Sequence, residues 1–159
     1  MVTAWRSVTI LLVALLQGLA FAHVLERPAK LTYDGRFYMT LQRTLYVQWG
    51  PPNVGGILEP AAIAATAILA FLVRRNTLAL WSTVAALALL LAAFPGAFYF
   101  WVAPANDFFL NTMPGILPQK WMAMRDNWET GHAVRFALQL AALALLVVPL
   151  AREASAGKS

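Results

Sequence analysis

The sequence predicts an all-α fold: an integral membrane four-helix bundle with an amphipathic surface helix in its first long loop. Composition gives the first reason, since 60% of the 159 residues are hydrophobic and only 12% are charged, against roughly 25% charged residues in soluble domains. The second reason is that four long apolar runs alternate with polar or proline-rich segments. Four spans leave little of this chain for anything else, so residues 1–159 are expected to form one domain.

The expected spans cover about residues 5–26, 57–74, 77–102 and 131–151. The first contains an uncharged run from Ser7 to Leu25, which is longer than the apolar core of a signal peptide and suits a bilayer crossing. We therefore expect this segment to be retained as a span. Its helix is expected to end at Arg27, because Pro28 has no N–H to continue the hydrogen-bond ladder.

Local signals bound the remaining spans. Glu59-Pro60 is expected to begin the second helix, because proline suits the first helical turn, and Arg74-Arg75 ends it. Asn76 is a plausible cap for the third helix, and Pro95-Gly96 is expected to kink it. The fourth span carries a single charge between residues 131 and 151.

The first long connection, from Tyr33 to Trp49, is expected to hold the surface helix. Its apolar residues recur at helical spacing opposite polar ones, which is typical of a helix lying on a membrane surface. The apolar positions are Tyr38, Leu41, Leu45 and Trp49.

Charge and cysteine content limit the possible functions. The net charge of +5 comes from scattered basic residues without a stripe, so no nucleic-acid partner is expected and the main partner is the lipid bilayer. The chain has no cysteine, which excludes disulfides, thiolate metal sites and thiol redox chemistry.

Orientation is predicted from the shortest loop, because basic residues in short loops stay in the cytoplasm. We expect a location in the cell membrane. Arg74-Arg75 then places both termini in the cytoplasm and both long loops outside the cell. The basic residues expected inside are Arg6, Arg74, Arg75, Arg152 and Lys158, and those expected outside are Arg27, Lys30, Arg36, Arg43, Lys120, Arg125 and Arg135. The basic count alone would favour the opposite orientation.

With four spans, the notable polar residues fall at one end of the bundle. They are His23, Glu26, Glu59, Asn106, Asp107, Trp128, Glu129, His132 and Arg135, with Gln139 one turn deeper. On the fourth helix most of them share one stripe, and His23 and Glu26 share a face of the first. A polar stripe on a membrane helix should face protein or water, so the two faces are expected to oppose each other.

Three interpretations of this cluster remain open. Interfacial anchoring or a structural hydrogen-bond network between helices would account for it without any chemistry. A transition-metal site of iron, copper, manganese or zinc is the second, because Glu129-x-x-His132 has the spacing of four-helix carboxylate sites. Its candidate ligands are His23, Glu26, Glu59, Glu129 and His132. The third is a haem with His23 and His132 as axial ligands.

A motif in the second half resembles the anthrone-oxygenase-like family of small membrane proteins. Pro-x-Asn follows the third span, then a tryptophan, and Trp-x-x-x-His-x-x-Arg leads into the fourth. These positions are Pro104, Asn106, Trp121, Trp128, His132 and Arg135. The resemblance implies a four-helix membrane fold and, in the few members with an assigned activity, oxygenation of an anthrone to a quinone.

The resemblance also implies roles for four residues. His132 would act as the base, Arg135 would stabilise the enolate, Asn106 would donate a hydrogen bond to it, and Trp128 would pack on an aromatic substrate. The first loop and His23-Val-Leu-Glu26 depart from the family pattern.

The expected function is therefore a membrane oxidoreductase or oxygenase acting on a hydrophobic aromatic or quinone-like molecule at the outer end of the bundle. The alternative is a non-catalytic membrane subunit or assembly partner whose polar cluster is structural. A transporter is disfavoured, because no ionisable residue lies near the expected midplane.

Overall fold

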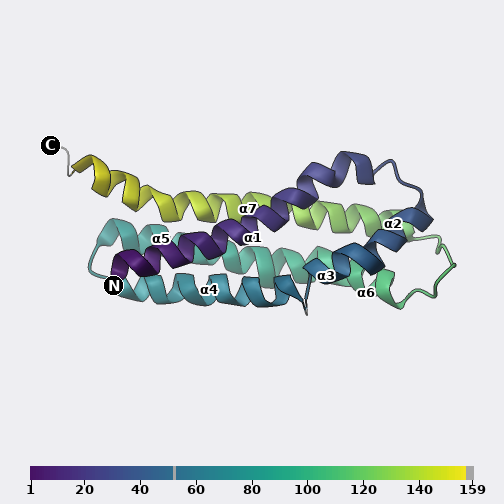
Figure 1. The fold of residues 1–159 in the computed structure, drawn as a ribbon, viewed down its shortest axis with the longest axis horizontal. Helices are drawn as coiled ribbons and strands as arrows, with labels where there is room; N and C mark the ends of the chain where they lie inside the picture. The colour runs from purple at the N-terminus through teal and green to yellow at the C-terminus, as the bar shows by residue number, and fades with distance from the viewer. Residues whose placement is uncertain (52, 157–159) are drawn as a thin grey trace.

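The computed structural model describes residues 1–51 and 53–156 and confirms the predicted all-α, four-helix membrane fold. Four long apolar helices pack side by side as a bundle (Figure 1). They are α1 (Val2–Lys30), α4 (Val54–Leu72), the continuous helix Thr77–Asn111, and α7 (Trp121–Ala156). Each is long and apolar enough to cross a membrane. Lys158, used above for orientation, lies outside the described residues.

The third long helix has three parts: α5 (Thr77–Leu91), the π-helical segment η2 (Ala92–Val102) and α6 (Ala103–Asn111). Asn76 caps its start as predicted, its side chain accepting from the Ala79 N–H at 3.1 Å. Pro95, expected to kink the helix, falls inside η2. The wider π turns accommodate a residue that cannot donate to the α-helical ladder.

Two helix boundaries differ from the predicted ones. The first helix continues through Pro28 to Lys30, and the Leu31 N–H still bonds to the Arg27 carbonyl at 3.0 Å. A proline removes one hydrogen bond of a long helix, which tertiary packing of the next turn offsets. The second helix begins at Val54, so Glu59 and Pro60 lie inside it rather than at its start. Both differences bring additional charged side chains into the bundle.

The first loop forms a helix, as predicted, in the order α2 (Gly35–Leu41), η1 (Gln42–Tyr46) and α3 (Val47–Trp49). Its buried face differs from the predicted one, since Leu45 is exposed while Tyr38, Met39, Gln42 and Tyr46 are buried. The helix packs over the end of the bundle beside α6 (Figure 1), so protein covers its inner face. It lies along the bundle at the end opposite the two termini, and we call it the covering helix.

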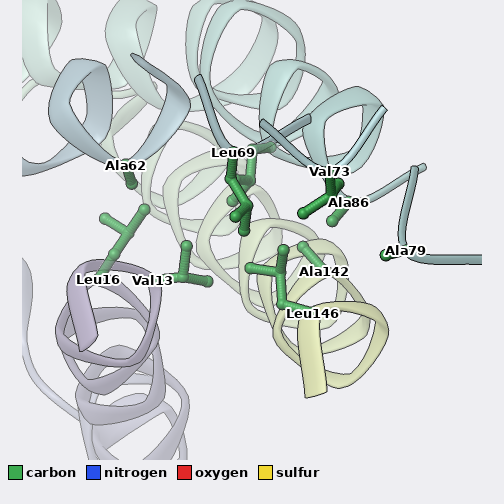
Figure 2. Packing of buried hydrophobic residues seen from close by; sticks show 10 residues of the cluster. Val13, Leu16, Ala62, Leu69, Val73, Ala79, Ala86, Ala142 and Leu146 are labelled. Atoms are coloured by element: carbon green, nitrogen blue, oxygen red, sulfur yellow. The ribbon is translucent and has the colours of Figure 1, made fainter. Parts of the chain in front are cut away.

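The core consists of two clusters with different compositions. Small and branched aliphatic side chains fill the half near the termini, as Figure 2 shows for Val13, Leu16, Ala62 and Leu69. Large aromatic residues gather at the opposite end, under α2, η1 and α3. Alanines allow close helix packing where no water enters, whereas the aromatic end surrounds the polar residues.

The outer surface is apolar, as expected of helices that contact lipid. Large side chains on all four long helices are exposed, including Leu11, Phe71, Trp81, Phe100 and Leu140. Such continuous exposure is unusual in a water-soluble monomer. The lipid bilayer is therefore the natural partner of this surface.

Candidate functional site

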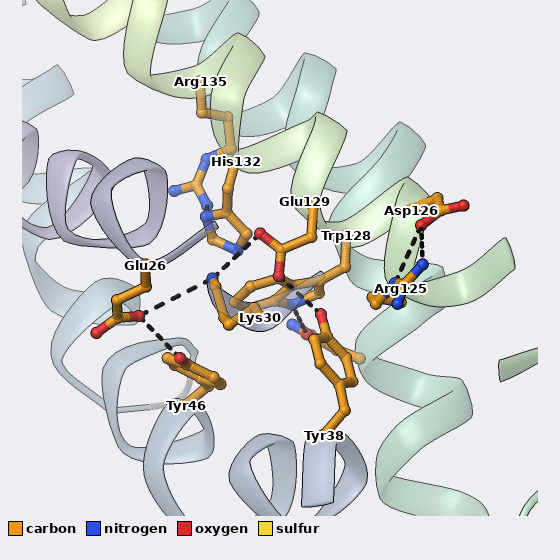
Figure 3. A network of polar contacts seen from close by, with 11 residues as sticks. Glu26, Lys30, Tyr38, Tyr46, Arg125, Asp126, Trp128, Glu129, His132 and Arg135 are labelled. Atoms are coloured by element: carbon orange, nitrogen blue, oxygen red, sulfur yellow. Dashed lines mark hydrogen bonds and ion pairs between the residues drawn. The ribbon is translucent and has the colours of Figure 1, made fainter. Parts of the chain in front are cut away.

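Most of the predicted polar residues converge at the end of the bundle that α2, η1 and α3 cover, whereas Asp107 is exposed and accepts a hydrogen bond from Asn111. They come from the last turns of α1, the first turns of α4, the η2–α6 junction and the first half of α7, as Figure 3 shows in part. Thirteen polar or charged residues are buried among the described residues, including His23, Lys30, Glu59, Glu129 and His132. Such burial in a membrane bundle requires partners for each group.

A small cavity lies within this cluster, with a volume of about 40 Å³. All four residues predicted to be catalytic line it, together with two of the other predicted metal ligands. These lining residues are Asn106, Trp128, His132 and Arg135, with His23 and Glu59. Apolar residues of α1 form another wall, and Trp49-Gly50-Pro51 lies over it. At ~10–15 Å³ per water, the space holds about three waters.

The two histidines of the chain face each other across the α1–α7 contact. Their ring centroids are 4.0 Å apart, and Trp128 lies 4.1 Å from His132 and 4.8 Å from His23. The predicted opposition of the two polar faces is therefore correct. A haem between the imidazoles does not fit, because rings in direct contact leave no space for a macrocycle.

Arg135 joins the histidine pair to α4. Its Nη2 is in hydrogen-bond contact with Glu59 Oε1, and its Nη1 lies 3.5 Å from His132 Nδ1. Both Glu59 and Arg135 are nearly inaccessible to solvent. A buried arginine–carboxylate pair is stable only when both charges are present, so the two residues act as a unit.

Trp128 and Asn106 form a second fixed pair on the cavity wall. The indole Nε1–H donates to Asn106 Oδ1 at 2.8 Å. Gly131 lets α7 approach η2 closely enough for this contact, since a Cβ there would lie 2.7 Å from Val102 Cγ2. The helix crossing thus positions both cavity-lining side chains.

Lys30 is a central member of the cluster that the sequence analysis did not select. Its Nζ lies 3.1 Å from Glu129 Oε2 and 4.6 Å from the Trp128 ring centroid, and its side chain is 1% exposed. Figure 3 shows it between Glu26 and Glu129, below His132. The missed signal was helical spacing, because Glu26 and Lys30 are four residues apart if the helix passes Pro28.

Two tyrosines of the covering helix, which consists of α2, η1 and α3, form hydrogen bonds with carboxylates of this cluster. The Tyr38 hydroxyl donates to Glu129 Oε1 at 3.0 Å, and the Tyr46 hydroxyl donates to Glu26 Oε2 at 2.8 Å. Burial, together with the nearby Glu129 carboxylate, raises the pKa of Tyr38. Burial and the hydrogen bond to Glu26 raise the pKa of Tyr46. Both phenols therefore remain protonated donors at neutral pH.

The predicted metal ligands are not brought together as one set. Among the residues that the structure describes, no group of three or more His, Asp or Glu side chains is arranged to hold a metal ion. Glu59 pairs with Arg135, and Glu129 pairs with Lys30, although Glu129 and His132 lie on the same helix. Each of these two carboxylates is thus already paired with a buried cation and is not free to bind a metal ion.

Fold and site together define a multi-pass membrane protein with a buried, charge-balanced polar cavity at one end of a four-helix bundle. No family model matches the chain, and comparisons with curated proteins and with solved structures found no match. The resemblance to the anthrone-oxygenase-like family therefore rests on its six motif residues, and it stays a prediction.

Proposed function

We propose that this chain is a membrane oxidoreductase of the oxygenase type that acts on an aromatic or quinone-like molecule at the polar cavity. One observation carries the proposal: the side chains of Asn106, Trp128, His132 and Arg135, from two separate helices, all line the same cavity. The helical spacing of Trp128, His132 and Arg135 predicts a shared face of α7, but nothing in the sequence requires Asn106 of α6 to lie beside them. Buried titratable groups around a cavity are typical of active sites.

The two sides of the cavity suit a molecule with an apolar body and a polar edge. Leu16, Leu19 and Ala20 of α1 form an apolar wall, and His132 and Arg135 line the cavity from α7. With an anthrone, dioxygen would be the oxidant: the methylene carbon loses two hydrogens and gains one oxygen, and the second oxygen leaves as water.

The size of the cavity adds one requirement. Pockets for drug-sized ligands usually measure about 300–1,000 Å³, which is far more than the space here. An aromatic ring can enter only if the segment Trp49-Gly50-Pro51 moves away from the cavity. Substrate-dependent movement of such a covering segment is common in enzymes.

Oxygen consumption tests this function directly. Purified protein in nanodiscs should consume dioxygen when anthrone is added, and His132→Gln should lower the rate by about 100-fold or more, as expected for loss of a group acting at the reacting centre. Trp81→Phe is the matched control, because Trp81 is exposed on the lipid-facing surface. Equal rates in His132→Gln and the wild type would contradict the proposal, and no uptake by the wild type would exclude this substrate.

The alternative is a non-catalytic subunit or assembly partner for another membrane protein. The internal ion pairs of Lys30 with Glu129 and of Arg135 with Glu59 favour it, because such pairs can fix helix positions without taking part in any chemistry. In that case His132→Gln would lower stability without any enzymatic consequence. Measuring oxygen uptake and unfolding on the same variant separates the two functions.

We also propose that the protein lies in the cell membrane with both termini in the cytoplasm and the cavity at the outer face. The short Arg74-Arg75 turn supports this orientation.

A further inference from the structure

Asn106, His132 and Arg135 line the cavity, and neighbours already use part of their hydrogen-bonding capacity. The groups that remain for a ligand are hydrogen-bond donors. We infer that the cavity recognises a carbonyl or phenolate oxygen, with Asn106 and His132 as hydrogen-bond donors and Arg135 as the residue that positions His132. This inference deepens the proposed function by naming the ligand group and by changing the role of His132.

Asn106 is oriented by Trp128. An indole Nε1–H can only donate, so the Asn106 atom 2.8 Å from it must be the amide oxygen. The amide NH₂ is then the part of Asn106 left to meet a ligand in the cavity that it lines. A fixed amide of this kind offers a donor without any rearrangement.

His132 is oriented by Arg135 in the same way. A guanidinium has no acceptor, so the Nη1 contact with His132 Nδ1 at 3.5 Å requires a lone pair on Nδ1. In the neutral imidazole the proton is then on Nε2, since the tautomer is set by the bond that the other nitrogen makes. His132 therefore presents an N–H to a ligand and is not the base.

Arg135 is itself held in place by Glu59 on α4. Its other arm reaches His132, and the guanidinium lies over the Phe98 ring, 5.3 Å from the centroid. The positive charge thus stays next to His132 in the cavity that Asn106 also lines. Donors with a nearby cation favour an oxygen that carries negative charge, such as a phenolate or an enolate.

The tautomer can be read without any activity. Because the chain contains only two histidines, protein labelled with ¹⁵N-histidine gives two imidazole spin systems, which His23→Gln assigns. We expect His132 to show a protonated Nε2 and an unprotonated Nδ1. The double variant Glu59→Gln/Arg135→Met, which removes the charge pair together, should release this preference and give a mixture of tautomers.

The matched control removes another two-residue ion pair, which lies at the far end of the bundle. Arg6→Met/Glu153→Gln removes the Arg6–Glu153 contact of 2.6 Å and should leave the His132 tautomer unchanged. A proton on Nδ1 of His132 in the wild type would overturn the inference. The same tautomer in the Glu59/Arg135 variant as in the wild type would also overturn the positioning role of Arg135.

Ligand polarity is tested with two probes of the same carbon skeleton. Menadione carries two carbonyl acceptors, and 2-methylnaphthalene carries none. We expect menadione to shift the His132 Nε2 resonance, with an affinity at least 10-fold higher than that of the hydrocarbon. Asn106→Asp keeps the acceptor for Trp128 but loses the NH₂, and it should weaken menadione binding about 10-fold.

Equal effects of both probes, or no effect of menadione, would overturn recognition of an oxygen acceptor. Failure of the proposed function looks different. If anthrone gives no oxygen uptake while menadione still shifts His132, anthrone is excluded as the substrate and the acceptor site stands.

Discussion

Lys30 and Glu129 place opposite charges where neither is solvated by water. Their side chains are each 1% exposed and 3.1 Å apart, and Tyr38 also donates to the carboxylate. Removing one partner of a buried pair leaves an uncompensated charge, which costs about 3–5 kcal/mol. Lys30→Met and Glu129→Gln should each destabilise the folded protein by about that amount, measured as unfolding in SDS titrations.

The double variant Lys30→Met/Glu129→Gln should recover a large part of the loss, because it leaves no unpaired charge. Arg6→Gln is the comparison variant, since the Arg6–Glu153 pair is largely exposed at the Glu153 side and such pairs are worth about 0–1 kcal/mol. Additive losses in the double variant would show that the two residues do not act as a pair.

Some residues of the buried polar cluster are predictable from the sequence and others are not, for a physical reason. His132 and Arg135 stand out because they interrupt an apolar run on one face of a helix. Lys30 was missed because Pro28 was expected to end its helix, although it lies one turn beyond Glu26. Propensity describes an isolated helix, whereas the pairing of Lys30 with Glu129 is tertiary and outweighs it.

At the level of helices, the contact between α7 and η2 depends on Gly131, because glycine has no side chain. A Cβ on Gly131 would lie 2.7 Å from Val102 Cγ2 and 2.8 Å from Trp101 Cβ, and neither atom belongs to a flexible chain end. Gly131→Ala should therefore separate the two helices and cost about 1–3 kcal/mol, as overpacking does. Thermal unfolding in detergent would measure the loss.

Gly18→Ala is the natural control, because nothing lies within 4 Å of a Cβ at that position. Alanine is a better helix former than glycine by about 1 kcal/mol, so this variant should be neutral or slightly stabilising. Equal destabilisation by the two substitutions would mean that the α7–η2 contact is not as close as described.

The helices were predictable where the sequence signal, such as an apolar run or a cap, lies within a single helix. Four apolar runs gave four long helices, and the Asn76 cap forms as expected. The covering helix was predicted, but its inner face was not, because the expected apolar face included Leu45 whereas the buried face includes Gln42. Tyr38 belongs to the predicted apolar face, whereas the contact of Tyr46 with Glu26 on α1 is not revealed by any periodicity within the loop.

For the molecule as a whole, the even number of membrane spans decides which groups can meet. Four crossings place the two termini at one end and both long loops at the other (Figure 1). This alone brings residues far apart in the chain, such as His23 and His132, to the same end. The sequence therefore predicts which groups share an end, and packing decides which of them pair.

Which end faces the cytoplasm can be measured with single cysteines, because the natural chain contains none. Ser155→Cys lies at the end of the termini, and Met113→Cys lies in the exposed loop between α6 and α7. Neither substitution removes a charge, so neither alters the topological signal. In intact cells, a membrane-impermeant maleimide should label Met113→Cys and leave Ser155→Cys unlabelled, while lysis should expose both. Labelling of Ser155→Cys alone would place the cavity on the cytoplasmic side. Arg74 and Arg75 would then face outward, against the usual bias.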